Sequence, residues 1–285
     1  AVSPLQIGSS VQILSETQFT FGLIVCLIAL ARLLKQPREA SCGRIAFTNG
    51  ILTGLTVLVR PGWLPWTGIS AGIVVLFGKM PLAKRILCGA LIGIGCLVAL
   101  LPWAWRNHEV TGHWIFTSLW SGPSLYDGLH EGATGASDMD FFDKENVLST
   151  MSEYETNAHY KRRAIDFVMS NPGRTLELAF IKAGRFLSPS LNAAGFSGGL
   201  FSVFCTLWYL VLTVLILAGA FSLRRKLSTV ALLAAPFLQF LLVHMVFVGS
   251  IRYRLPVEFP LSILAAQGLV SLWQRWNRQS QTEGV

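Results

Sequence analysis

Long runs of apolar residues, separated by short polar stretches, dominate the pattern of this chain. A run of about 17–25 apolar residues is long enough to cross the hydrocarbon core of a bilayer as a helix. Seven such segments are expected, at 16–34, 45–59, 62–78, 86–103, 200–222, 228–248 and 256–273. The pattern therefore predicts an all-α polytopic membrane protein with about seven transmembrane helices.

A polar region interrupts the apolar runs and divides the chain into parts. Residues 104–199 are expected to form a single loop subdomain between two membrane parts, 1–103 with four spans and 200–273 with three. Residues 274–285 would form a polar tail. The subdomain is expected to be connected to the spans rather than to fold independently.

Local patterns predict short elements within the loop subdomain. His113–Ser118 is expected to be a short strand or an extended piece, Ser121–Pro123 and Gly128–Gly135 to be loops, and about Asp143–Ser170 to be helical. Asn171 and Pro172 suit the N-cap and first position of a further helix. Its apolar face would lie on the membrane surface or against the spans, and would hold Leu176, Ala179, Phe180, Ala183 and Leu187.

Charge supplies the expected orientation. Only 13% of the residues are charged, against about 25% in soluble proteins. Lys and Arg favour the cytoplasmic ends of spans, and four groups fall on one side of seven crossings: Arg32, Lys35, Arg38 and Arg44; Lys79, Lys84 and Arg85; Arg224, Arg225 and Lys226; Arg275 and Arg278. The tail is then cytoplasmic and the loop subdomain extracytoplasmic. The net charge of +8 is therefore explained mainly by basic residues at the cytoplasmic face of the membrane, and it does not indicate a nucleic-acid partner.

Three arginines do not follow this charge rule. Arg60, Arg252 and Arg254 are expected at the outer membrane boundary, together with Glu16. The arginines could extend to lipid phosphates, and Glu16 could simply favour the positive N-terminus of its helix. Alternatively, the four side chains line a cavity, as charged groups at membrane depth usually do. Guanidinium groups bind phosphate bidentately and a carboxylate can act on a hydroxyl, so this cluster suits a phosphate-bearing lipid substrate.

Other candidate chemistry is sparse. The five cysteines lie in or beside apolar segments without zinc-ligand spacing. Asp138-Met139-Asp140 resembles a metal-binding DxD motif, but we expect a solvated loop and no metal site, while a divalent cation stays an open possibility. His244 is expected either to form a hydrogen bond inside the bundle or to contact a substrate. Lys161–Arg163 is expected to be a solvated helix face.

Six short motifs together carry a family resemblance. They are LSETQFTF at Leu14–Phe21, GLTVLVRP at Gly54–Pro61, PWAWRN at Pro102–Asn107, SLYDGLHEGATG at Ser124–Gly135, NPGR at Asn171–Arg174 and RYRLP at Arg252–Pro256. Their sequence and order resemble those of polytopic GT-C glycosyltransferases of the dolichyl-phosphate-mannose protein mannosyltransferase and aminoarabinose transferase type. Each motif is weak alone, and the run Tyr126–His130 departs from the family's YxGN, which leaves the sugar and acceptor open.

The resemblance implies an enzyme, its substrates and its location. Such enzymes transfer a sugar from a polyprenyl-phosphate-linked donor to a lipid, protein or glycan on the extracytoplasmic face, here of a bacterial plasma membrane. Glu16 would be catalytic, Arg60, Arg252 and Arg254 would bind the donor phosphate, and Tyr126, Tyr253 and His244 would line the substrate site.

The resemblance also implies that part of the enzyme precedes this chain. The family's first outer loop, with an essential acidic residue, comes before the segment matched by Leu14–Phe21. The chain is therefore expected to be a C-terminal portion, truncated before Ala1, and could be inactive by itself.

Two other classes stay open. An O-antigen ligase-like transferase also has an outer loop and arginines near the interface, but would not be expected to show the ordered motifs. A transporter or lipid-binding membrane protein would show inverted repeats and interrupted helices in corresponding halves, and no such symmetry is evident in the sequence.

Overall fold

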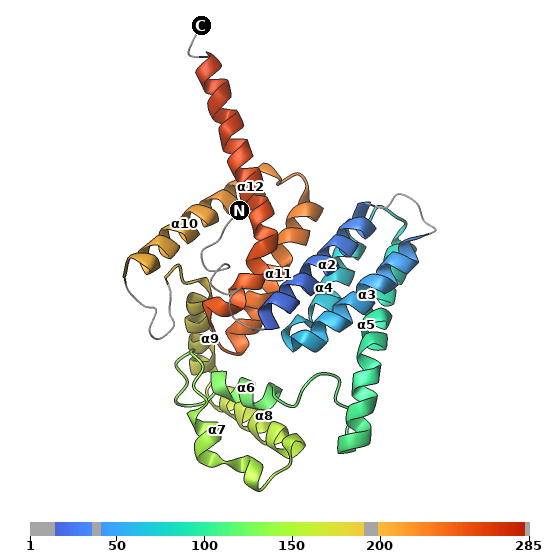
Figure 1. Cartoon of the computed structure of the whole chain (residues 1–285), viewed down its shortest axis with the longest axis vertical. Helices are drawn as coiled ribbons and strands as arrows, with labels where there is room; N and C mark the ends of the chain where they lie inside the picture. Colours follow the sequence, from blue (N-terminus) through green and yellow to red (C-terminus); the bar gives the residue numbers. More distant parts are fainter. Residues whose placement is uncertain (1–14, 36–40, 191–198, 283–285) are drawn as a thin grey trace.

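The computed structural model describes residues 15–35, 41–190 and 199–282 (Figure 1). Within these ranges the chain forms helices and turns and no strand, which confirms an all-α polytopic membrane protein. Six helices are long and apolar enough to cross a bilayer: α2 (Ser15–Lys35), α3 (Cys42–Val59), α5 (Leu82–Thr111), α10 (Gly199–Ser222), α11 (Leu227–Val246) and α12 (Ile251–Thr282). Of the residues used above, Leu14, Arg38 and 191–198 lie outside the described ranges.

The third expected span is shorter than the other segments. It begins as a 3₁₀ turn, η2 (Pro61–Trp63), and continues as α4 (Trp66–Phe77), a helix of 12 residues. Twelve residues extend about 18 Å, less than the roughly 30 Å of a bilayer core. α3 and α5 nevertheless run parallel, because Gly50 of α3 packs on Ile92 of α5 and Gly54, four residues later, packs on Cys96. The chain between them therefore returns to the end of the bundle where α3 began.

Glycines allow the first helices to approach closely. A Cβ on Gly50 would overlap the carbonyl oxygen of Ile92, and one on Gly54 would lie 2.7 Å from the carbonyl oxygen of Cys96. Gly50 and Gly54, four residues apart, therefore allow close packing of helices in lipid. Gly93 of α5 has no atom within 4 Å of its added Cβ. The helix contact of α5 therefore involves a different set of positions.

A second group of helices, α10, α11 and α12, completes the membrane part. α10 and α12 cross where Gly219 packs on Leu264 and Gly268 packs on Leu215. α11 lies between α12 and the first group, and Phe240 of α11 joins the core around Phe19 and Trp63. The described loop subdomain lies at one end of the bundle (Figure 1), which we call the subdomain end.

The loop subdomain is built from short helices. Gly112, with a φ of 74°, ends α5, and the Nδ2 of the buried Asn107 donates to the carbonyl oxygen of Ile115 to hold the returning chain. The elements that follow are α6 (Ser121–Gly128), α7 (Asp140–Glu145), η3 (Val147–Ser149), α8 (Glu153–Ser170) and α9 (Pro172–Leu187).

One of the local expectations for the subdomain is wrong, because Ser121–Pro123 begins α6 instead of forming a loop. His113–Ser118 forms bends and irregular segments without a strand. α6 is stabilised by tertiary contact, since the backbone N–H of Gly122 donates to Oδ1 of Asn157 in α8 at 2.7 Å. Asn171 and Pro172 do start α9, although the Asn171 side chain forms no capping hydrogen bond.

α9 buries a different face from the one that its apolar pattern suggested. Leu176 and Phe180 are exposed, with 60% and 63% of their surface accessible. The buried side chains are those of Leu178, Lys182 and Phe186. Leu178 packs in the core of the subdomain with residues of α8, whereas Lys182 and Phe186 contact α11. The expected apolar face therefore points away from the bundle, where lipid or another apolar phase could cover it.

Candidate functional site

Glu16 lies between two arginines at the subdomain end of the bundle. Its Oε1 accepts a hydrogen bond from Nη2 of Arg60 at 3.2 Å and another from Nε of Arg252 at 2.5 Å. The Glu16 side chain is 6% exposed and that of Arg60 is 16% exposed, whereas that of Arg252 is 51% exposed. One carboxylate is thus shared by two guanidinium groups, of which only one faces the outside. We call these three residues the arginine cluster.

Three separate elements meet at the arginine cluster. Glu16 is in the first turn of α2, and Arg252 is in the first turn of α12. Arg60 is the residue between α3 and η2, where an extended conformation and the following Pro61 end the helix. The end of α3 at Arg60-Pro61 therefore directs the Arg60 guanidinium toward the first turns of α2 and α12.

Aromatic rings pack against the arginine cluster. The Arg60 guanidinium lies 5.6 Å from the ring centre of Phe19 and 5.2 Å from that of Tyr253. Tyr253 stacks on His244 with ring centres 4.3 Å apart. Cation–π contact of this kind is stronger when the cation is desolvated, so the rings stabilise Arg60 in its orientation.

His244 matches the first of its two expected roles. It is buried, and its Nδ1 lies 2.9 Å from the carbonyl oxygen of Val248, within hydrogen-bonding distance. Its ring stacks on that of Tyr253, which in turn contacts the Arg60 guanidinium. His244 therefore contacts the cluster through Tyr253 and not directly.

Two polar atoms of the arginine cluster are not used in hydrogen bonds. Oε2 of Glu16 and Nη1 of Arg60 are buried and have no partner among the described residues. With two guanidinium groups and one carboxylate, the cluster carries a net charge of +1. Such a site can accept an anionic oxygen that bridges Arg60 and Arg252.

Arg254 departs from the arrangement expected for it. Its side chain is 0% exposed, and its Nε donates to Oε1 of Glu258 at 2.5 Å. Its Nη1 donates to the carbonyl oxygens of Phe186 and Ser188 at 2.9 and 2.8 Å, and its guanidinium lies 3.8 Å from the ring centre of Tyr209. Arg254 thus joins the end of α9 to α10 and α12, and it forms no contact with the arginine cluster.

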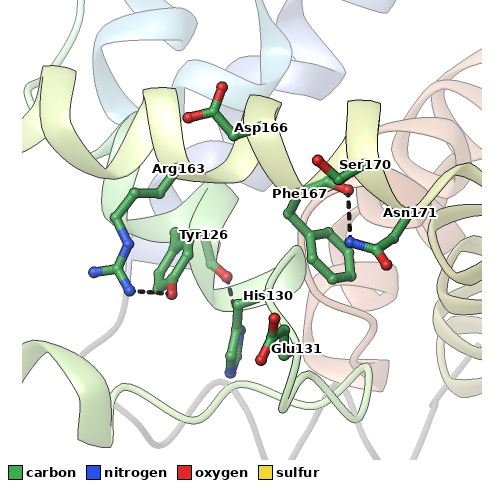
Figure 2. A pocket seen from close by; sticks show the side chains of 8 residues that line it. All are labelled: Tyr126, His130, Glu131, Arg163, Asp166, Phe167, Ser170 and Asn171. Carbon is green, nitrogen blue, oxygen red and sulfur yellow. Dashed lines mark hydrogen bonds between the residues drawn. The ribbon is translucent and has the colours of Figure 1, made fainter.

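Tyr126 is also separate from the arginine cluster. It lines a pocket within the loop subdomain, where its hydroxyl accepts a hydrogen bond from Nη2 of Arg163 at 2.6 Å (Figure 2). Arg163 in turn pairs with Glu145, so it is not the solvated residue that the sequence suggested. Lys161 and Arg162 are exposed as expected.

Two buried charged groups were missed by the sequence analysis. Glu258 follows Arg254 by four residues, a spacing that places both on one helix face and could have identified the pair. Lys182 is fully buried in α9, and its Nζ donates to the carbonyl oxygen of Val246 at 2.8 Å. Burial lowers the pKa of Lys182 to about 8, while Asp127 nearby acts in the opposite direction. Nothing in the local sequence pattern distinguishes this lysine.

The DxD-like segment is a polar turn that leads into α7, whose first residue is Asp140. The backbone N–H of Asp138 donates to the buried Asp127, and Asp140 pairs with Lys144 on the surface. Across the described ranges, no three His, Cys, Asp or Glu side chains gather closely enough to hold a metal ion.

Comparison of the chain with known protein families, with curated proteins and with solved structures finds no match.

Proposed function

We propose that this protein is an integral-membrane glycosyltransferase that uses a polyprenyl-phosphate-linked sugar as its donor. The observation that carries the proposal is the position of Glu16 between Arg60 and Arg252, at one end of a bundle of apolar helices. A cation pair of this kind at membrane depth favours a phosphate that is attached to a lipid. The ordered sequence motifs support the transferase class.

The cluster suggests how donor binding prepares the reaction. Both guanidinium groups bind the same oxygen of Glu16, so a phosphate that binds them competes with this carboxylate. Arg252 is half exposed and is the first contact for an entering phosphate. Displacement from Arg252 would leave Glu16 free to accept a proton.

The proposed chemistry is a single displacement at the anomeric carbon of the sugar. An acceptor hydroxyl forms the new carbon–oxygen bond while the bond from that carbon to the phosphate oxygen breaks. Glu16 takes the proton of the hydroxyl, and the lipid phosphate leaves as an anion held by Arg60 and Arg252. No redox step or further reactant is required.

An apolar cavity on the same helices supports a lipid-linked donor. It has a volume of about 250 Å³ and lies between α2, α11 and α12, where its lining includes Ile24, Ile28, Phe259 and Ile263. At 1.5 Å per residue, these side chains lie about 10–18 Å along their helices from Glu16 or Arg252. A prenyl chain attached to a phosphate in the cluster could therefore occupy the cavity.

The proposed location follows from the distribution of charge. Basic residues gather at the bundle end opposite the loop subdomain, where Lys and Arg indicate the cytoplasm. The arginine cluster would then face the extracytoplasmic side of a bacterial plasma membrane. The proposed partners are membrane lipid, the polyprenyl-phosphate sugar and an acceptor, without nucleic acid.

Binding of undecaprenyl phosphate to the detergent-solubilised chain tests the proposal, with undecaprenol as the matched ligand without phosphate. Arg60→Gln and Arg252→Gln should each weaken binding of the phosphate about tenfold, the loss expected for one charge-assisted contact. Arg275→Gln, an exposed arginine elsewhere in α12, should leave binding unchanged. Equal affinity for the phosphate and the alcohol would overturn the proposal.

A further inference from the structure

The C-terminal end of α9 packs alongside the last turns of α11. The backbone of Lys182 lies against Gly249, in the segment that follows α11, because a Cβ on Gly249 would overlap the carbonyl oxygen of Lys182. One turn later, the ring centre of Phe186 lies 5.6 Å from that of Phe237 and 5.9 Å from that of His244. α9 therefore runs from the segment beyond α11 toward the interior of the bundle (Figure 1).

The length of α11 gives the depth of this contact. α11 has 20 residues, which extend about 30 Å, and this length matches the hydrocarbon core of a bilayer. At 1.5 Å per residue, Phe237 and His244 lie about 14 and 3 Å from the end of α11 at Val246. Because Phe186 contacts both rings, the last turn of α9 lies at the depth of the acyl chains in the leaflet on the side of the loop subdomain.

The exposed side chains of α9 change in character along the helix. Arg174 and Glu177 form a partly exposed ion pair near its start. The exposed residues of its second half are all apolar, namely Phe180, Ile181, Gly184 and Leu187. Phe180 is 63% exposed and Leu187 is 39% exposed. A helix whose exposed face loses its charged groups in this way suits a passage from the polar headgroup region into lipid.

The carbonyl groups at the end of α9 are satisfied from within the protein. The last four carbonyl oxygens of an α-helix have no partner in the helix, and an unsatisfied backbone group in the hydrocarbon region is costly. Nη1 of the buried Arg254 donates to the carbonyl oxygens of Phe186 and Ser188 at 2.9 and 2.8 Å. Glu258 in turn neutralises Arg254. These two carbonyl groups therefore require no water.

We propose that the C-terminal end of α9 is inserted in the leaflet on the side of the loop subdomain. Phe180 and Ile181 would lie at the lipid boundary, and Leu187 would lie among the acyl chains. Lipid is the expected occupant of this face because α9 packs on α11 and α12, which are both long and apolar enough to cross a bilayer. The exposed face of α9 thus continues the lipid-facing surface of the bundle. This inference does not depend on the proposed glycosyltransferase function.

Fluorescence quenching at single introduced cysteines tests the insertion, with the whole chain in phosphatidylcholine nanodiscs. Phe180→Cys and Leu187→Cys are each labelled with bimane. The five native cysteines are buried, so the unsubstituted chain treated in the same way gives the background. Phosphatidylcholine with a nitroxide on its acyl chain is the lipid quencher, and iodide is the aqueous quencher. The nitroxide lipid should remove most of the fluorescence at Leu187→Cys and a part of it at Phe180→Cys, while iodide should remove little at Leu187→Cys.

Two exposed positions outside the inserted end serve as matched controls. Glu177→Cys, in the first half of α9, and Asp143→Cys, in α7, are both exposed and should be quenched mainly by iodide. Iodide quenching at Leu187→Cys as strong as that at Asp143→Cys would place this face in water and overturn the proposal. Protection of Leu187→Cys from both quenchers would also overturn it, because a protein surface such as a second copy would then cover the face. Equal quenching by the nitroxide lipid at Glu177→Cys and Leu187→Cys would contradict insertion by one end.

Discussion

Arg254 and Glu258 form a buried ion pair one helical turn apart in α12, with Nε of Arg254 2.5 Å from Oε1 of Glu258. Two residues earlier, Arg252 is half exposed and binds Glu16. The two arginines of the RYRLP motif therefore have different surroundings. Arg254 holds α9, α10 and α12 together, while Arg252 is available to a ligand.

Removal of one partner of the buried pair should strongly destabilise the protein. We expect Arg254→Ala or Glu258→Gln to lower the free energy of unfolding by about 3–5 kcal/mol, because each leaves an uncompensated buried group. The double variant Arg254→Met with Glu258→Leu should lose less, since no buried charge is left. Thermal unfolding in detergent measures the effect, with Arg275→Ala as the exposed control. Wild-type stability in Arg254→Ala would show that the pair contributes little.

Replacement of Glu16 should separate binding from catalysis. Glu16→Gln removes the carboxylate that competes with a phosphate for Arg60 and Arg252. We expect undecaprenyl phosphate to bind roughly tenfold more tightly, the equivalent of about 1.4 kcal/mol, while any sugar transfer is lost. Titration of the lipid phosphate into the wild type and the variant provides the comparison. Weaker binding in Glu16→Gln would mean that the carboxylate orients the arginines for the ligand.

Two glycines in apolar helices should respond differently to the same substitution. Gly50→Ala places a methyl group against the carbonyl oxygen of Ile92, so α3 and α5 must separate. Overpacking of this kind typically costs about 1–3 kcal/mol. Gly93→Ala is the matched control, because its added Cβ meets no atom within 4 Å. Thermal unfolding should show a lower midpoint for Gly50→Ala alone, and equal losses would contradict the helix contact.

Lys182 should make stability depend on pH in the alkaline range. Its pKa is about 8 in the folded protein, whereas a lysine in the unfolded chain has a pKa of 10.5. Between these values the unfolded chain binds a proton that the folded chain does not, so stability rises with pH, by up to roughly 3 kcal/mol. Below pH 8 both states are protonated and the contribution is constant. Urea unfolding from pH 7.5 to 10.5 should show this rise, and Lys182→Met should flatten it.

A single introduced cysteine can test the expected side of the loop subdomain. All five native cysteines are buried, so an impermeant maleimide should label them poorly. Asp143→Cys places a thiol at an exposed position of α7. We expect labelling from the extracytoplasmic side of intact cells. Labelling only after the cytoplasmic side is opened would reverse the proposed orientation.

Much of the fold follows from hydrophobicity and charge along the sequence. The apolar runs predict the six long helices, since a bilayer core requires stretches of that length. The length of α4 was less predictable, because Pro61 and Pro65 fall inside an otherwise apolar run and divide it into η2 and a short helix. α6 depends on contact with Asn157, which local sequence does not reveal.

The candidate sites were predictable only in part. Arg60 and Arg252 were recognisable as exceptions to the charge rule, and the structure brings both to Glu16. Arg254 is an exception to the same rule, but its partners in α9 and α12 decide which way it faces. The pocket beside Tyr126 is lined by residues that are far apart in sequence, and it forms only through the packing of α6 on α8.

The segment between α11 and α12 connects the arginine cluster to the loop subdomain. The backbone N–H of Gly249 donates to the carbonyl oxygen of Gly135 at 3.1 Å, and Arg185 donates to the carbonyl oxygen of Gly249. Gly249 lies three residues before Arg252, and Gly135 lies four residues after Glu131. A shift of this segment on donor binding would therefore reach the loop subdomain through Gly135. Thermodynamic linkage requires the effect to be mutual, so a ligand of the loop subdomain that changed donor affinity would have its own affinity changed by the same factor.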